Sequence, residues 1–597
     1  MNGGRGPGRG PAFARPKEKT GTVLLKLWRY LAKYRWIIVL AAVLSIIGNA
    51  LGLVSPRLSG AAINAIEHES GVQFPVVIRY VVAMILVAAA SSLISWGLSA
   101  IMIRLSRNVV SKMRKDLFDH LTTLPIAFFD THQTGDVLSI LSYDVDTVGA
   151  TLSTDLTQII SSFVTVVGSF LMMVSIAPQL LLVFAVTIPL SLAITRWRAK
   201  IVRPLFSRRS RMLGAMNGYS EEAVGGLKTI RAYHQEEEFN QRFRTHNDNA
   251  VAATWKADHT AAVTGPTVNL INNLSLAAVS VFGALLYMGG SILLGDVSSF
   301  VLYSRKFSGP INEFANILAE IQSTLAAAER VLGLLALEPE PADAADALPV
   351  TECKGEIRFE NVSFGYTEDT TVLHHISFTA RPGQVVAIVG ETGCGKTTLI
   401  NLLMRFYDVS SGRILLDGRD IRTLKRNDLR RQFTMVLQDT WLFDGTVYDN
   451  LAYGRPGASR EEIIRAARAA NIHDMIMSLP HGYDTVVTDS GNSISKGQKQ
   501  LLTIARAMLM DSSMLILDEA TSNVDTQTEL LIQDAMLELM RGRTCFVIAH
   551  RLSTITGADR IMVMDHGRLM ESGTHQELLR RRGAYYELYQ AQFDHAD

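Results

Sequence analysis

Long apolar stretches without charge fill much of the first half of the chain, and short apolar runs between helical patterns fill the second half. A membrane-spanning helix needs about 20 mostly apolar residues. Four charge-free stretches reach that length, covering residues 36–56, 80–103, 156–195 and 260–295. The third is long enough for two spans, with a break at Ala177-Pro178-Gln179. The pattern therefore predicts five spanning helices.

A sixth, weaker candidate span covers residues 297–321. Four charges interrupt its pattern: Arg305, Lys306, Glu313 and Glu320. Such charges must face a water-filled cavity or the bundle interior, because exposure to lipid is costly. The alternative is a span that begins nearer Phe307, with the first two charges at the outer interface. In the fifth span, Asn269, Asn272 and Asn273 could line a substrate path, but interhelical hydrogen bonds are the favoured interpretation.

Lys and Arg gather before the first span, after the second and after the fourth, and the turn between the third and fourth carries neither. The positive-inside rule places the N-terminus and both long connections, residues 104–155 and 196–259, in the cytoplasm. Both connections are rich in helix formers, so the spanning helices are expected to continue beyond the bilayer.

Composition agrees with a membrane half and a water-soluble half. Charged residues make up 19% of the chain, below the usual share of about 25%, and the net charge of +1 gives no global field for nucleic acid. The three cysteines are widely spaced, which disfavours a disulfide framework or a zinc site. Residues 1–23 are expected to be a disordered basic tail, 24–337 the membrane domain, 338–354 an acidic Pro/Ala-rich linker, and 355–597 an α/β domain.

A glycine-rich loop carries the clearest chemistry. It follows the apolar run 385–389, matches G-x-x-x-x-G-K-[ST], and precedes a helix predicted over residues 397–406. Its backbone N–H groups can converge on phosphate oxygens, Lys396 can reach the terminal phosphates, and Thr397 can ligate Mg²⁺. The candidate ATP-binding residues here are Gly390, Glu391, Thr392, Gly393, Cys394, Gly395, Lys396, Thr397 and Thr398. Cys394 lies at a helix N-terminus, where a thiol pKa tends to fall, but filling a variable position is the favoured role.

Three further apolar strands end in polar side chains. Asp518 and Glu519 follow one strand, where Asp518 can hold Mg²⁺ and Glu519 can polarise the attacking water. His550 ends a second strand and can contact the γ-phosphate or hold the water-orienting acid. Gln438 follows a third strand and can sense Mg²⁺ or water. Glu519, His550, Lys396 and Gln438 are the candidate catalytic residues, and Thr397, Gln438 and Asp518 the candidate metal ligands.

A second anion site is predicted about a hundred residues after the loop. Ser495 and Gly497, with Gln498, stand at the start of a helix that carries Arg506. One chain has no need of a second phosphate cradle. The number of spans also favours the sixth candidate. With the N-terminus in the cytoplasm, six spans put the nucleotide domain in the cytoplasm, where ATP is, whereas five would put it outside.

The order of these motifs resembles the ATP-binding cassette (ABC) family, and six spans ahead of one cassette resemble a half-size exporter. The resemblance covers residues 24–593. It implies an all-α transmembrane domain of six helices followed by an α/β P-loop NTPase domain. It implies that Tyr366 stacks on adenine, that the Ser495 motif closes over ATP on the partner's phosphate loop, and that Asp525 lies at the dimer seam. It further implies coupling helices within residues 128–136 and 226–238.

One motif departs from the family pattern. The usual signature is Leu-Ser-Gly-Gly-Gln, whereas this chain has Ile494-Ser495-Lys496-Gly497-Gln498. An altered signature beside Glu519 and His550 resembles the hydrolysing half of a heterodimer. A heterodimer with a second ABC half-transporter is therefore favoured over a homodimer, in which the change would be tolerated drift.

The resemblance implies ATP-driven export of lipophilic or amphipathic compounds, drug-like or lipid-like, across the bacterial plasma membrane by alternating access. Two alternatives stay open: a nucleotide-gated channel or regulatory subunit, and an exporter-fold importer. The sequence determines neither the small-molecule substrate nor the direction of transport.

Overall fold

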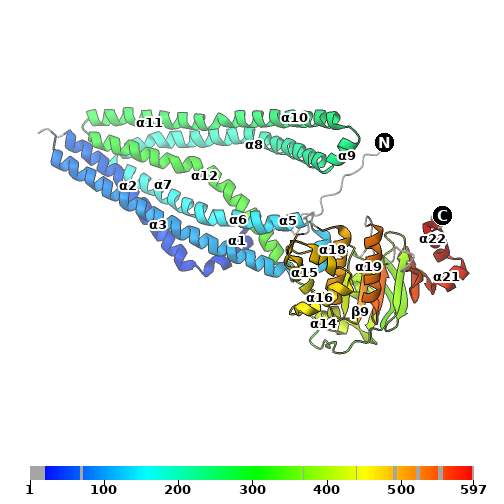
Figure 1. The fold of residues 1–597 in the computed structure, drawn as a ribbon. Coiled ribbons are helices and arrows are strands. Elements are labelled where there is room, and N and C mark those ends of the chain that lie inside the picture. Colours follow the sequence, from blue (N-terminus) through cyan, green and yellow to red (C-terminus); the bar gives the residue numbers. More distant parts are fainter. Residues whose placement is uncertain are drawn as a thin grey trace. The chain divides into compact units, whose positions relative to one another are not determined.

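The structure is a computed structural model that describes residues 20–67, 72–367, 369–438, 440–488, 494–518, 525–548 and 555–593. The chain divides into two compact units (Figure 1). The first reaches Leu124 and resumes over His132–Leu337; the second holds Pro125–Thr131 and the chain from Glu338 onward. The short helix α4 (Ile126–Thr131) thus packs with the second unit although its neighbours in sequence belong to the first.

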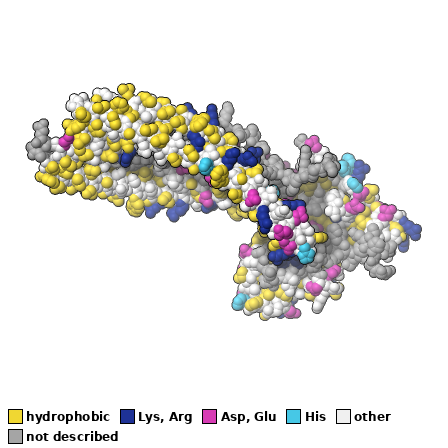
Figure 2. Space-filling view, turned by 90° about the horizontal axis from the view of Figure 1, so that it is seen from above, with side chains coloured by type: hydrophobic (Ala, Val, Ile, Leu, Met, Phe, Trp, Pro, Cys, Tyr) yellow, Lys and Arg dark blue, Asp and Glu magenta, His cyan; other side chains and the backbone are white. Residues whose placement is uncertain are grey.

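The first unit is entirely helical. Its helices are α1 (Thr20–Ala32), α2 (Arg35–Ile66), α3 (Phe74–Leu121), α5 (Thr134–Ser139), the π-helical η1 (Ile140–Asp144), α6 (Val145–Ala150), the π-helical η2 (Thr151–Asp155), α7 (Leu156–Ile176), the 3₁₀ turn η3 (Pro178–Leu180), α8 (Leu181–Gly225), α9 (Leu227–Ala232), α10 (Glu236–Ala262), α11 (Thr264–Met288) and α12 (Leu294–Leu335). Hydrophobic side chains cover much of its outer surface (Figure 2). That surface fits a lipid solvent rather than water.

Five helical stretches among the described residues are long and apolar enough to cross a membrane. They are Arg35–Ile66, Phe74–Leu121, Thr134–Ile176, Pro178–Gly225 and Glu236–Met288. These contain the five spans predicted from sequence. The sixth candidate forms the continuous 42-residue helix α12 but is not among the five, so its crossing stays a prediction. The helices do run on past the apolar stretches, as predicted for both long connections.

Small residues and buried hydroxyls join α12 to α2. A Cβ on Gly60 would lie 2.3 Å from the carbonyl oxygen of Gly295, so the two backbones approach as closely as glycine allows. Ser299 donates to the Pro56 carbonyl at 2.9 Å, and the buried Tyr303 donates to the Leu53 carbonyl at 2.5 Å. These bonds satisfy hydroxyls that lipid could not hydrate.

The asparagines singled out in the fifth span do not make the hydrogen bonds expected of them. Asn269 and Asn273 are exposed, and none of Asn269, Asn272 and Asn273 makes a side-chain hydrogen bond to any described residue. The interhelical hydrogen bonds expected of them are therefore wrong for this chain alone. Arg305 and Lys306 are exposed, which is compatible with a water-filled cavity and with the outer interface, and not with the interior of the unit's own bundle.

The second unit is built on two larger sheets. The strands of a six-stranded sheet lie in the order β12-β11-β3-β10-β9-β6, and those of a four-stranded antiparallel sheet in the order β2-β1-β4-β5. Their bounds are β1 (Ile357–Phe364), β2 (Leu373–Ala380), β3 (Val385–Gly390), β4 (Ser411–Leu416), β5 (Arg419–Asp420), β6 (Phe433–Val436), β9 (Met514–Asp518), β10 (Thr544–Ile548), β11 (Arg560–Asp565) and β12 (Arg568–Gly573); β7 (Gly445–Thr446) and β8 (Val486–Val487) form a separate pair.

Helices cover the six-stranded sheet, and they are α13 (Lys396–Leu403), α14 (Arg426–Arg431), α15 (Val447–Ala452), α16 (Arg460–Ala469), α17 (His473–Ser478), α18 (Lys496–Met508), α19 (Thr526–Met540), α21 (His575–Arg581) and α22 (Ala584–Phe593), with 3₁₀ turns η4 (Ile421–Thr423) and η5 (Gly482–Asp484). Alternate residues of β3 enter two different cores. Val386 and Ile388 face the core that contains α13 and the antiparallel sheet, while Ala387 and Val389 face the core that contains α16, α18 and α19. This alternation is the period of a strand buried on both faces.

The predicted linker is held against the second unit. Glu340 pairs with the Arg430 guanidinium at 2.5 and 3.0 Å, and both carboxylate oxygens of Asp343 accept from the Arg426 backbone N–H at 3.1 Å. The acidic side chains of this stretch therefore contact α14: Glu340 forms an ion pair with Arg430, and Asp343 accepts hydrogen bonds at the N-terminus of the helix.

Candidate nucleotide-binding site

The glycine-rich loop joins the end of β3 to the start of α13. Gly390, Gly393 and Gly395 have φ of +151°, +88° and +102°, in the region that L side chains rarely adopt. At Gly390 a Cβ would also lie 2.2 Å from the Met564 carbonyl oxygen of the neighbouring strand β11. The loop therefore needs glycine both for its backbone angles and for its approach to the sheet. Its turn leaves the first N–H groups of α13 without helical partners, which suits an anion.

Lys396 is tied to this loop. The residue is only 8% exposed, and its ammonium donates to the carbonyl oxygens of Gly390 at 2.7 Å and Glu391 at 2.9 Å. Both acceptors belong to the loop, so the charge is held where the loop N–H groups gather. A phosphate oxygen would give this ammonium a charge-assisted partner stronger than a carbonyl.

The other loop residues divide by exposure. Glu391, Thr392, Gly393 and Thr397 are exposed, whereas Cys394, Gly395 and Thr398 are buried. Burial raises the pKa of the Cys394 thiol, although the nearby Lys396 ammonium opposes the shift. That direction is opposite to the fall typical of a helix N-terminus, and it agrees with a space-filling role for Cys394. Helix α13 ends at Leu403, three residues before the predicted end, and Arg405 has a φ of +49°.

The polar strand ends lie along one edge of the parallel sheet. Ile388 pairs with Ile548, and Ile548 pairs with Asp518, so β3, β10 and β9 end side by side. Val436 at the end of β6 pairs with Leu517, and the exposed Gln438 follows two residues later. Carboxyl ends of parallel strands are where α/β proteins bind ligands. Glu519 and His550 follow these strands in sequence but lie outside the described residues.

Tyr366 stands next to α13. Its hydroxyl lies 3.1 Å from Thr398 Oγ1, and its ring meets the Tyr407 ring edge-on at 5.1 Å. The residue is 46% exposed, so part of its surface stays open to a flat ligand. These contacts are compatible with stacking on adenine.

Sequence reasoning missed Tyr407. Its hydroxyl donates to Asp130 Oδ2 at 2.5 Å, and this carboxylate belongs to the α4 segment. Burial raises the pKa of Tyr407, and the bond to Asp130 raises it further. A line of contacts therefore runs from Asp130 through Tyr407 and Tyr366 to Thr398, at the start of the phosphate-loop helix. The residues around Tyr407 in the sequence do not predict its hydrogen bond to Asp130, because the two residues are 277 positions apart.

The second predicted anion site is a capped helix start. Ser495 caps α18: its Oγ accepts from the Gln498 N–H at 3.3 Å, and its N–H donates to Gln498 Oε1 at 2.9 Å. Lys496, at the altered position, is exposed, and Gly497 is buried. Arg506 anchors the same helix by donating to the Asn450 carbonyl at 2.9 Å.

The helices that begin at the two predicted phosphate sites pack on different faces of the sheet. Helix α13 packs in one core and α18 in the other. Asp525 caps α19, because its carboxylate accepts from the Thr528 N–H at 2.9 Å, and this bond lowers the pKa of Asp525.

The residues fit a nucleoside triphosphate. A glycine cradle that a Cβ would obstruct, an ammonium held in it and a free helix N-terminus form an anion site. The exposed Thr397 and the strand-end Asp518 are oxygen donors of the kind Mg²⁺ prefers. When bound, the triphosphate would supply the phosphoryl group for transfer, and the metal would neutralise charge on its oxygens.

Two family profiles match the chain. The profile for the ABC transporter transmembrane region matches residues 38–311, and that for the ABC transporter matches residues 373–522. An ABC transporter ATP-binding protein of Bacillus subtilis, YfiC, is 41% identical over 581 residues, covering 97% of this chain and 96% of its own.

The chain is also similar to a fatty acid transporter and to an exporter of known structure. A fatty acid ABC transporter ATP-binding/permease protein of Mycobacterium tuberculosis is 43% identical over 521 residues, covering 87% of this chain and 82% of its own. The structure of a bacterial Atm1-family ABC exporter with ATP bound superimposes with a TM-score of 0.78 at 30% identity, covering 95% of this chain and all of the other.

Proposed function

Because the chain belongs to the ABC transporters, with an exporter-type membrane region followed by an ATP-binding domain, we propose that it exports lipid-like or drug-like amphipathic compounds. It is a multi-pass membrane protein and an ATP-driven translocase. ATP with Mg²⁺ binds at the Lys396 loop, and two chains close over the nucleotide to drive alternating access.

The observation that carries the dimer is the separation of α13 from α18 by the sheet. The proposed phosphate clamp joins the Lys396 loop of one chain to the Ser495 cap of a second, and it is supported by the packing of the helices that begin at these two sites on different faces of the sheet. The roles follow the sequence predictions: Thr397 and Asp518 hold the metal, Gln438 senses it, Tyr366 stacks on adenine, and Asp525 lies at the seam. Glu519 activates the attacking water, and His550 contacts the γ-phosphate or holds Glu519 in place.

The proposed partner is a different half-transporter. Lys496 replaces a glycine at an exposed helix start, where it adds a positive charge to the face that meets the other chain's nucleotide. We place the chain in the plasma membrane, with the N-terminus and the nucleotide domain in the cytoplasm. Lipid-like cargo is supported by the fatty acid transporter relative and by a lipid A-core flippase of Syntrophus aciditrophicus, 37% identical over 511 residues.

Two measurements test the proposal. Affinity purification of the chain from its own membranes should bring a second ABC half-chain in equal amount, whereas a homodimer alone contradicts the heterodimer. In inverted vesicles, a fluorescent acyl-chain amphiphile should accumulate with ATP and not with a non-hydrolysable analogue. ATP-gated leakage without accumulation would indicate a channel, and uptake by right-side-out vesicles would indicate an importer.

A further inference from the structure

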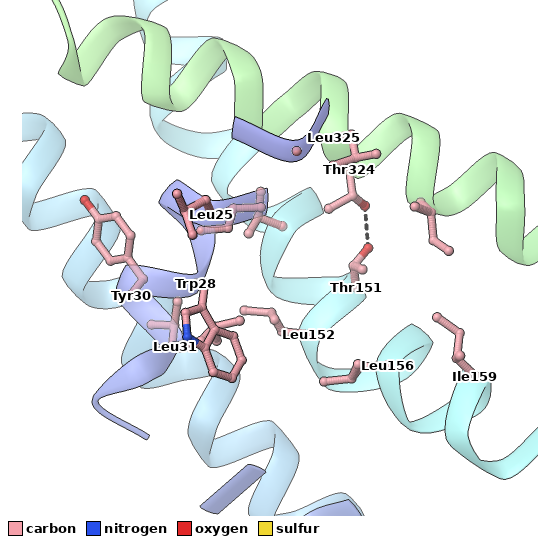
Figure 3. Close-up of a pocket in the computed structure, with 15 residues that line it drawn as sticks. Leu25, Trp28, Tyr30, Leu31, Thr151, Leu152, Leu156, Ile159, Thr324 and Leu325 are labelled. Atoms are coloured by element: carbon pink, nitrogen blue, oxygen red, sulfur yellow. Dashed lines mark hydrogen bonds between the residues drawn. The ribbon is translucent and has the colours of Figure 1, made fainter. Parts of the chain in front are cut away.

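An apolar cavity of about 610 Å³ lies within the helical unit between α1 and the helices it covers. Figure 3 shows α1 on one side and α7 and α12 on the other. The floor is formed by Val109 and Val148, which are 2% and 1% exposed. The rim is open, because Leu25 and Trp28 are 62% and 50% exposed although both line the cavity.

The cavity offers almost no partner to a polar ligand. Its lining is aliphatic and aromatic apart from two threonines and a tyrosine. The hydroxyls of Thr151 and Thr324 are bonded to each other, and Thr151 also donates to Asp155 at 2.7 Å. The Asp116 carboxylate interacts with the Tyr30 hydroxyl and, with burial, raises the pKa of Tyr30. Because these groups are already paired, a ligand that carries its own polar groups inward would lose hydration without replacing it.

The position of the cavity fits the boundary of a bilayer. Leu156 and Ile159, which line it, stand at the start of the charge-free stretch 156–195. Helix α1 is 13 residues long, too short to span a membrane, and it carries Trp28 beside basic residues. Short amphipathic helices with tryptophan and basic residues lie in the membrane interface.

The positive charge on and after α1 favours a lipid with an anionic headgroup. Helix α1 carries Lys26 and Arg29 and no acidic residue, and Lys33 and Arg35 follow it directly. Basic segments at a membrane surface attract anionic lipids. Size is also adequate: a cavity of about 150 Å³ holds the six carbons of benzene, and at that ratio about 610 Å³ holds about 24 carbons, more than a chain of roughly 16 carbons needs.

We propose that this cavity holds one acyl chain of an anionic bilayer lipid, with the phosphate headgroup at the basic residues of α1. The lipid is a resident ligand that fills the space between α1, α7 and α12, and it is separate from the transported compound. Its binding requires neither ATP nor a transport cycle, so the proposal stands apart from the proposed export function.

The test uses the full chain, with whatever partner copurifies, in vesicles of phosphatidylcholine and phosphatidylglycerol. A trace of phosphatidylglycerol carrying a mid-chain diazirine is photolysed, and labelled residues are mapped by mass spectrometry without nucleotide. Labelling is expected to concentrate on Leu25, Trp28, Leu152 and Leu156, several-fold above Leu171. Leu171 is the reference because it lies on α7, as Leu156 does, is 61% exposed and does not line the cavity.

Filling the cavity supplies the decisive variant. Leu152→Trp should reduce labelling of the α1 peptide several-fold, and Leu156→Phe is a second filling variant if the first fails to fold. The matched control, Leu171→Trp, should leave that labelling unchanged. Arg29→Gln should weaken labelling by phosphatidylglycerol and not the weaker labelling by a phosphatidylcholine probe.

Three outcomes would overturn the proposal. The first is equal labelling of the cavity and of Leu171. The second is labelling that Leu152→Trp does not reduce. The third is a crosslink from α1 to another polypeptide in place of lipid, because a partner helix would then fill the cavity. Equal labelling by the phosphatidylglycerol and phosphatidylcholine probes would contradict the part of the proposal that the bound lipid is anionic.

Discussion

The contact between Asp130 and Tyr407 gives the sharpest test of how helix movement reaches the nucleotide. The Tyr407 hydroxyl donates to the Asp130 carboxylate at 2.5 Å, the Tyr407 ring meets Tyr366 at 5.1 Å, and Tyr366 lies 3.1 Å from Thr398. Tyr407→Phe removes the first link only, because the ring and its edge contact remain. The variant therefore separates signalling through α4 from the nucleotide site itself.

The magnitude follows from the chemistry of that bond. A hydrogen bond to a charged group contributes about 1.5–3 kcal/mol, and exposure of Asp130 reduces this to about 1 kcal/mol. About 1 kcal/mol is roughly a five-fold change in an equilibrium. We expect substrate stimulation of ATP hydrolysis to fall about five-fold. ATP affinity should change less than about two-fold, because no group beside the loop is removed.

The assay is ATP hydrolysis by the reconstituted transporter with and without a transported amphiphile, together with binding of a fluorescent ATP analogue. Asp130→Asn should have the same effect, and the double variant should be no worse than either single variant, because both remove one interaction. Tyr453→Phe is the control, since Tyr453 is exposed and lies outside this line of contacts. Unchanged stimulation in Tyr407→Phe, or additive effects of the two changes, would refute the reasoning.

Three further predictions concern chemistry and stability. Glu519→Gln should abolish steady-state ATP hydrolysis while ATP still binds, and rapid turnover by a purified complex of this variant would remove Glu519 as the base. Arg330→Met should destabilise the helical unit by about 2 kcal/mol, because Asp144 is 2% exposed and loses a two-point ion pair at 2.6 and 2.7 Å, while the exposure of the Arg330 side chain weakens that pair; thermal unfolding in detergent measures this, and adding Asp144→Asn should restore part of the loss. The Ser459 N–H and Arg455 lower the pKa of Glu462 from 4.5 to about 2, so the cap of α16 stabilises fully above pH 4.5 and is lost as pH falls toward 2; hydrogen exchange of α16 should show this acid sensitivity, and Glu462→Gln should remove it.

Elements defined by local pattern were predicted well. The spans followed from runs without charge, since hydrocarbon excludes unpaired polar groups over a length set by the bilayer. Strand β3 begins at Val385, the first residue of the predicted run, and β6 ends at Val436, two residues before Gln438. The glycine-rich loop was identified because its backbone angles demand glycine at fixed spacing. Predictions that rested on a single polar residue were weaker, as the exposed Asn269 and Asn273 show.

The sequence by itself determined that this chain has a membrane half, a phosphate loop and strand ends that carry carboxylates, because each depends on neighbours along the chain. The tertiary structure decided which distant residues meet: Asp130 with Tyr407, Asp144 with Arg330, and Thr151 with Thr324 are 277, 186 and 173 residues apart. It also decided that α13 and α18 occupy different faces of one sheet and that α1 covers an apolar cavity. No local pattern encodes such pairings, since they arise only when helices and strands pack.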